Sequence, residues 1–207
     1  MPPASERQSA KIKLLDAALN VIRAKGYSAT TVDDLCAADG VTKGAFFHHF
    51  ASKEALAIAA ADYWSEVTSA LFAEAPYHAL ADALDRVLGY IDFRKALLRG
   101  SVPEFSCLVG TLVQEVYDTH PAIRAAVDRS ISEHAARIET DIAEAMRALG
   151  VEGNAQSLAL HTQAVIQGAF ILAKAKGGAE VAADSIDHLR RYVELLFANP
   201  KARSETR

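Results

Sequence analysis

Nitrogen-bearing side chains that could bind an anion or a metal ion lie close together near the N-terminus: Lys43, His48, His49 and Lys53. Adjacent histidines point to different sides of a helix, so His48 and His49 are poorly placed to share a metal ion, and no metal site is predicted. A lysine ammonium attracts phosphate, but lysines are also common on solvated helix faces. Without further information the residues favour the solvated face for both lysines. For the histidines, the alternatives to phosphate contact are surface exposure and the disfavoured metal site.

A second group of polar side chains lies within the largely apolar segment 103–117, which is predicted to be helical. Cys107, Thr111, Gln114 and Glu115 could orient a small ligand in a pocket with an apolar lining. Core packing explains each of them equally well when they are taken singly. The thiol of Cys107 is also a candidate for modification by electrophiles, although a lone cysteine in an apolar helix usually only packs.

No arrangement of residues in the sequence is typical of an enzyme. Ser106 has no neighbouring histidine, no glycine-rich phosphate loop occurs, and the acidic residues are scattered as on ordinary helix surfaces. Cys36 and Cys107 fit neither a metal spacing nor a disulfide framework, so both are expected to be reduced thiols. We therefore predict no catalytic activity, no cofactor and no bound metal.

Residues 30–50 are predicted to form two short helices joined by a tight turn. Thr30 or Thr31 can cap the first helix, and Gly40 can end it because only glycine enters the left-handed conformation without steric penalty. Thr42 can cap the second helix. The apolar contacts between the two helices come from Val32, Leu35, Val41, Phe46 and Phe50, which leaves Lys43, Gly44, Phe47 and His48 to face outward. This pattern is a helix-turn-helix.

The same stretch resembles the DNA-binding domain of the TetR/AcrR family of bacterial transcriptional regulators. In that family the motif follows one N-terminal helix and ends in an aromatic-x-histidine-phenylalanine box, followed by serine, lysine and glutamate. The matching positions are Thr30, Thr31, Leu35, Gly40, Val41, Phe47, His49, Phe50, Ser52, Lys53 and Glu54. Two positions depart from the family: Asp39 stands where a small apolar residue is usual, and Phe47 lacks the hydroxyl with which the usual tyrosine binds a DNA phosphate.

The resemblance implies a DNA-binding domain at residues 1–53 and a larger helical domain for ligand binding and dimerisation at residues 54–207. The helix at 42–50 would enter the major groove, with Lys43 on guanine edges or phosphate and Gly44 allowing close backbone approach. The implied DNA contacts are Thr30, Thr31, Thr42, Lys43, Gly44, Phe47, His48, His49 and Lys53. The predicted ligand contacts are Cys107, Thr111 and Gln114, from their polar positions in segment 103–117, and Lys174. The resemblance to electrophile-sensing members implies that Lys174 would favour the thiolate of Cys107.

The composition independently predicts an all-α protein. The 207 residues are 51% hydrophobic and 23% charged, and they favour helix formers over strand formers. The net charge of −4 divides unevenly, because residues 1–53 carry seven Lys or Arg against five Asp or Glu, and the rest carries 15 against 21. This suits a basic DNA-binding head on an acidic body. No apolar run is long enough for a membrane span or a secretory signal, so we expect a cytoplasmic protein without membrane contact.

The remaining helices are delimited mainly by glycine and proline, and they are predicted at about 9–26, 52–74, 79–99, 103–117, 120–149, 155–176 and 181–197. The last two carry more apolar residues than one inward-facing stripe requires, and in the family they pack against the same pair of a second subunit. A monomer that buries both faces is the alternative. We therefore predict a homodimeric regulator, a repressor released from a palindromic DNA operator by a small-molecule effector. The alternative is a helical ligand-binding or thiol-responsive protein without specific DNA binding.

Overall fold

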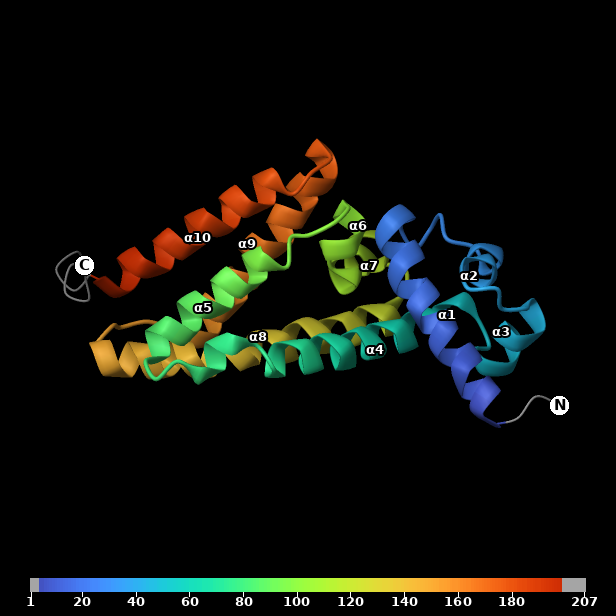
Figure 1. The fold of residues 1–207 in the computed structure, drawn as a ribbon, viewed down its shortest axis with the longest axis horizontal. Coiled ribbons are helices and arrows are strands. Elements are labelled where there is room, and N and C mark those ends of the chain that lie inside the picture. Colours follow the sequence, from blue (N-terminus) through green and yellow to red (C-terminus); the bar gives the residue numbers. More distant parts are fainter. Residues whose placement is uncertain (1–3, 199–207) are drawn as a thin grey trace. The chain divides into compact units, whose positions relative to one another are not determined.

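The computed structural model describes residues 4–198, and every regular element among them is helical (Figure 1). The ends of the two predicted domains, residues 1–3 and 199–207, lie outside the described residues. The elements are α1 (Ala4–Lys25), α2 (Val32–Ala38), α3 (Lys43–His49), α4 (Lys53–Ala73), the 3-10 helix η1 (Pro76–Ala79), α5 (Ala83–Ala96), α6 (Val102–Phe105), α7 (Leu108–Val116), α8 (Pro121–Leu149), α9 (Ala155–Lys176) and α10 (Glu180–Ala198). The predicted all-α class is confirmed.

Two predicted helices differ from the structure, because one begins later than predicted and the other is interrupted. The helix expected at 79–99 is preceded by η1 and begins only at Ala83, because Asp82 caps it by accepting hydrogen bonds from the N–H groups of Leu84 and Asp85. The helix expected at 103–117 is interrupted at Cys107, whose backbone is extended at φ −87° and ψ 127°. The single long helix predicted there is therefore wrong.

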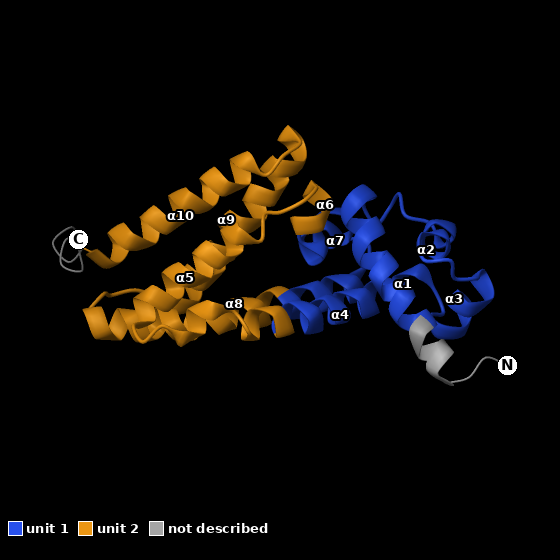
Figure 2. Ribbon diagram, in the orientation of Figure 1, with its two compact units in different colours: residues 1–69, 106–130 blue, residues 70–105, 131–207 orange. Residues whose placement is uncertain are grey.

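The chain forms two compact units (Figure 2). Unit 1 contains the residues up to 69 together with 106–130, so it holds α1, α2, α3 and α7. Its largest fully buried side chains include Leu14, Leu35, Phe46, Leu56 and Leu112. This core locks α2 and α3 against α1, as the helix-turn-helix pattern predicts, and it also includes α7 from the middle of the sequence. These units follow packing, so the domain boundary between residues 53 and 54 stays a prediction.

Unit 2 contains residues 70–105 and the chain from 131 onward. In it α10 packs against both α9 and α5. The guanidinium of Arg86 on α5 joins this helix to α8, with ion pairs of 2.7 Å to Asp141 and 2.6 Å to Glu144. Gly177 ends α9 at φ +77°, where its N–H donates to the carbonyl of Ala173. The predicted division of the last two helices at this glycine is confirmed.

Among residues 4–198, no helix combines the length and the apolar character that a membrane span requires.

Candidate nucleic-acid interface and effector pocket

The two threonines at the start of the helix-turn-helix have different roles. Thr31 caps α2, since its hydroxyl accepts from the N–H of Asp34 at 3.1 Å and the Asp34 carboxylate accepts from the N–H of Thr31 at 2.7 Å. The ammonium of Lys25, 2.6 Å away, and the hydrogen bonds from Thr31 hold the pKa of Asp34 well below its usual range. Thr30 is only 1% exposed, and its hydroxyl donates to the Gly26 carbonyl at 2.5 Å. The cap is therefore Thr31, and Thr30 supports the turn from inside.

Helix α3 presents one buried and one exposed aromatic ring. Thr42 caps the helix by accepting from the N–H of Ala45 at 3.1 Å. Phe46 is completely buried, whereas Phe47 is 57% exposed, with the two ring centroids 5.1 Å apart. Lys43, Gly44 and His48 are exposed on the same short helix. Burial of Phe46 thus fixes the helix, and the predicted contact residues around Phe47 remain accessible.

The predicted base contact, Lys43, already has a partner in this structure. Its ammonium lies 2.8 Å from a carboxylate oxygen of Asp33 on α2, and this hydrogen-bonded carboxylate raises the pKa of Lys43. Both side chains are largely exposed. Lys43 is therefore charged at neutral pH, and it would exchange Asp33 for a phosphate or base on binding DNA.

The histidine pair of α3 is split between two environments. His48 is exposed and His49 is half-buried, with their ring centroids 5.0 Å apart in an edge-to-face arrangement. Within the described part of the chain, no three side chains of histidine, cysteine, aspartate or glutamate gather as they would around a metal ion.

Lys53 binds the protein backbone. Its ammonium donates to the carbonyls of Tyr27 and Thr30, at 2.9 Å each, and lies 4.2 Å from the centroid of the Tyr27 ring. Burial lowers the pKa of this lysine. An ammonium has three N–H groups, so the two carbonyls leave one for the predicted phosphate contact.

The predicted ligand contacts are spread over both units. Cys107 and Thr111 are buried in unit 1, where the Thr111 hydroxyl donates to the Cys107 carbonyl at 3.0 Å. Gln114 is exposed on the same helix and donates to the Gly110 carbonyl at 2.7 Å. Lys174 is exposed on α9, in unit 2. These four residues stay predictions, and none of them lines the cavity described next.

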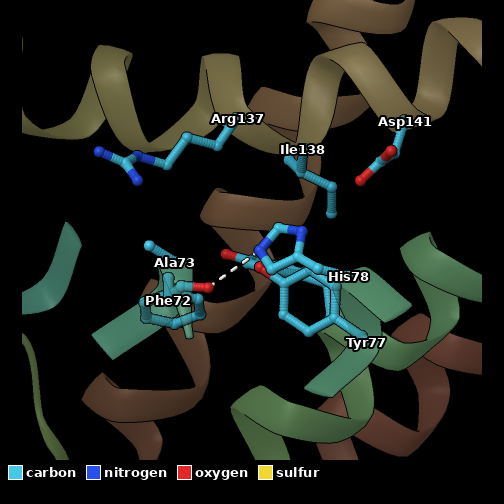
Figure 3. Close-up of a pocket in the computed structure, with 8 residues that line it drawn as sticks. Phe72, Ala73, Tyr77, His78, Arg137, Ile138 and Asp141 are labelled. Carbon is cyan, nitrogen blue, oxygen red and sulfur yellow. Dashed lines mark hydrogen bonds between the residues drawn. The ribbon is translucent and has the colours of Figure 1, made fainter. Parts of the chain in front are cut away.

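Unit 2 contains a cavity of about 300 Å³ (Figure 3). It is lined by Phe72, Ala73, Tyr77, His78, Tyr90, Arg137, Ile138 and Asp141. A ring nitrogen of His78 lies 2.9 Å from the Phe72 carbonyl oxygen, the contact dashed in Figure 3. Burial is the main cause that raises the pKa of Tyr77 to about 12, so its phenol stays neutral at physiological pH. The cavity therefore offers uncharged aromatic rings, with Arg137 and Asp141 as its charged lining residues.

A buried hydrogen-bonded chain extends from this lining. Gln163 of α9 donates to the Tyr90 hydroxyl at 2.8 Å, and this hydroxyl lies 2.9 Å from Nε2 of His134 on α8. Burial, with smaller contributions from Arg94 and Arg137, lowers the pKa of His134 to about 3. The imidazole is therefore neutral at pH 7, so its Nε2 can share one hydrogen bond with the Tyr90 hydroxyl.

The sequence interpretation missed this chain of three polar residues. Tyr90 and Gln163 are 73 positions apart, so local spacing does not connect them. One signal was available, because His134 lies three residues after Ile131 and four before Ile138, inside the apolar stripe of its helix. A polar residue in such a stripe needs a buried partner, which the structure identifies as Tyr90.

Comparisons with known proteins agree with this architecture. The family model for bacterial regulatory proteins of the tetR family matches residues 14–60, and the model for the tetracyclin repressor-like C-terminal domain matches residues 83–189. The HTH-type transcriptional repressor KstR2 of Rhodococcus jostii is 38% identical over 58 residues, which are 27% of this chain and 28% of that protein. The matches to the curated relatives span from 19% to 45% of the relatives' own lengths.

Two solved structures resemble nearly the whole chain. A TetR transcriptional regulator from Chloroflexus aurantiacus is 28% identical with a TM-score of 0.79, covering 92% of this chain and 96% of that one. A TetR family regulator from Agrobacterium tumefaciens is 21% identical with a TM-score of 0.78, covering 90% and 98%. The second likeness concerns the fold alone.

The buried His134 predicts a pH-dependent stability. Between the folded pKa of about 3 and the unfolded pKa of about 6.5, the unfolded chain binds a proton that the folded chain does not, so stability falls as the pH falls. From pH 7 to pH 5, His134 should cost about 2 kcal/mol in the free energy of unfolding. Urea titrations at both pH values should show this loss, and His134→Gln should remove it.

Tyr90→Phe is the matched control, because it removes the hydroxyl and leaves the imidazole buried. Since burial is the main cause of the shift, the pH dependence should persist in this variant. Equal pH slopes for the unaltered protein and His134→Gln would contradict the prediction.

Proposed function

This chain belongs to the TetR family of bacterial regulatory proteins, and on that premise we propose that it is a transcriptional regulator that binds an operator as a homodimer and responds to a small molecule. The observation that carries the proposal is the geometry of α3. A fully buried Phe46 anchors this helix, while Lys43, Gly44, Phe47 and His48 remain exposed on it. Repression, with release by the effector, is the form of regulation we favour.

The proposed DNA interface centres on the exposed residues of α3. The second helix of a helix-turn-helix inserts its N-terminal residues into the major groove, where lysine can bind guanine O6 and N7 or phosphate. Thr31, Thr42 and His49 flank this surface as polar contacts. Thr30 and Lys53 support it from within through their bonds to backbone carbonyls. The reading surface therefore contains fewer available cations than the sequence suggested.

The proposed dimer interface lies on α9 and α10. Large apolar side chains are exposed there: Leu160, Ile171, Leu172, Tyr192 and Leu195. Exposed apolar surface of this kind is typical of a protein interface. In a two-fold dimer each subunit reads one half-site, so the recognition helices must lie about 34 to 36 Å apart or a multiple of that distance. A palindromic operator follows from this symmetry.

The proposed effector site is the cavity of unit 2. Its volume of about 300 Å³ is at the small end of ligand pockets, and its rings come from Phe72, Tyr77 and Tyr90. Aromatic lining favours flat rings, and the charged side chains of Arg137 and Asp141 in the lining suit one polar group on the ligand. The effector class is therefore a one- or two-ring aromatic molecule with one polar group. A coupling of about 1 to 3 kcal/mol between effector and operator would change affinity roughly 5- to 150-fold.

A protein that binds ligands but no specific DNA is the second candidate function. Two observations favour it. Asp39 is exposed, and the carboxylate of Asp33 offsets the positive charge of Lys43. The two candidate functions predict different preferences for DNA sequence. A regulator should bind its selected duplex at least about a thousandfold more tightly than random duplex at physiological salt.

Lys43→Ala should weaken binding to the duplex selected from random sequences. Losing one base or phosphate contact should cost about 1 to 3 kcal/mol, and a phosphate contact should also reduce the salt slope of log K by about 1. Lys176→Ala is the control with the same charge change, on α9. Equal affinities for the two variants would argue against groove insertion of α3, and a failure to select any duplex would favour the second function.

Leu195→Glu should convert the dimer into monomers in sedimentation equilibrium. Leu195 is 67% exposed on α10, so a charge there is tolerated by the isolated chain but is expensive inside an apolar interface. Leu149→Glu, at the exposed end of α8, is the control and should remain dimeric. A Leu195→Glu protein that stays dimeric would place the interface elsewhere.

Ala73→Trp should abolish the response to the effector while operator binding persists, because the new ring fills the cavity. A panel of one- and two-ring phenols and aromatic acids serves as probe. A ligand at 100 times its Kd should stabilise the unaltered protein by about 2.7 kcal/mol. Ala70→Trp lies on the same helix outside the lining, and should respond normally. If Ala73→Trp retained the response, this cavity would be excluded as the effector site.

A further inference from the structure

The α1–α2 linker, residues 26–31, is held by two charged side chains from distant parts of the sequence. The carboxylate of Glu115 on α7 accepts from the N–H of Tyr27 at 3.1 Å and from the N–H of Ser28 at 2.8 Å. The ammonium of Lys53 on α4 donates to the carbonyls of Tyr27 and Thr30, at 2.9 Å each. Both polar groups of the Tyr27 backbone are thereby bound by charged partners, all within unit 1.

The contact with Glu115 depends on a glycine. Gly26 has φ +88°, and a Cβ atom at this position would overlap with a carboxylate oxygen of Glu115. Glycine is therefore needed here for two reasons: it adopts the left-handed backbone conformation without strain, and it lets the carboxylate come close. The Tyr27 ring is buried and lies edge-on to the His120 ring, with centroids 5.3 Å apart. The linker is thus fixed at its backbone and at its one large side chain.

The position of the linker determines where α2 begins. Thr30 donates to the Gly26 carbonyl, and Thr31, the next residue, is the N-terminal cap of α2. Helix α2 in turn packs against α3, which carries the exposed residues of the proposed reading surface. A linker that moves would therefore move α3.

From this geometry we infer that Glu115 is a positioning residue for operator recognition, which holds the helix-turn-helix to α7 through the N–H groups of Tyr27 and Ser28. The inference rests on the proposed DNA-binding function. It assigns Glu115 a role different from the ligand contact that its place in segment 103–117 suggested.

Glu115→Gln tests the positioning role of Glu115, because glutamine and glutamate side chains have nearly the same shape. The side-chain amide keeps one acceptor oxygen and replaces the other by a donor, so it cannot accept from both N–H groups. Glu115 is exposed, so the variant is expected to fold. Glu66→Gln is the matched control, since Glu66 is exposed on α4 in the same unit and the substitution changes the net charge equally.

The first readout is amide hydrogen exchange, which needs no DNA. Glu115→Gln should speed the exchange of at least one of the Tyr27 and Ser28 amides on the order of tenfold, while the amides of Leu15 and Ile22 within α1 stay as slow as in Glu66→Gln. A general loss of stability would speed all four amides together. Unchanged exchange at Tyr27 and Ser28 would overturn the inference.

The second readout is the ratio of affinities for the selected operator and for random duplex. Glu115→Gln should lower this ratio about tenfold, because operator recognition needs a correctly oriented α3 and non-specific binding depends mainly on charge. Glu66→Gln should leave the ratio unchanged. An unchanged ratio in Glu115→Gln, in a protein that does discriminate, overturns the positioning role. If the unaltered protein prefers no duplex, the proposed function fails, and the exchange data still decide whether Glu115 holds the linker.

Discussion

Backbone polar groups between two helices need hydrogen-bond partners outside the regular helical pattern, and the α1–α2 linker of this protein obtains several of them from two opposite charges. Glu115 takes the N–H groups of Tyr27 and Ser28, and Lys53 takes the carbonyls of Tyr27 and Thr30. Hydrogen bonds to charged groups are stronger than those between neutral groups. The orientation of the whole helix-turn-helix therefore depends on residues that lie outside the motif, one of them on α7 in the same compact unit.

The parts of the fold that could be predicted from the sequence are those with a local cause. Thr42 caps α3, and glycines end helices where the chain turns left-handed, as at Gly40 and Gly177. The break between α6 and α7 could not be predicted in this way, since neither glycine nor proline stands at Ser106 or Cys107. The extended backbone of Cys107 belongs to a buried segment, where tertiary packing overrides local propensity.

The candidate sites show the same contrast between features with a local cause and features that depend on distant residues. The exposed face of α3 follows from helical spacing once Phe46 is known to be buried. The partners of Lys53 and His134 involve residues 26 and 44 positions away, respectively, and such pairs have no signature in one sequence. Lys53 matched a family position and was therefore interpreted as a phosphate contact, although a lysine beside an open helix linker can equally bind carbonyl oxygens. Type and position alone do not distinguish these two uses of an ammonium.

The two units differ in whether their ionisable side chains are charged, and this difference affects the specificity for ligand and for DNA. In unit 2, burial keeps Tyr77 in the cavity lining and His134 behind Tyr90 neutral, which leaves Arg137 and Asp141 as the charged lining residues. On the reading surface, Lys43 stays charged but is paired with Asp33 in an exposed ion pair, which water and salt weaken. A phosphate or guanine can displace such a weak partner at little cost. In the proposed DNA complex, Asp33 would weaken the attraction of α3 for arbitrary DNA, and discrimination would come from the base contact of Lys43 and from the fit of Gly44 and Phe47 against the groove.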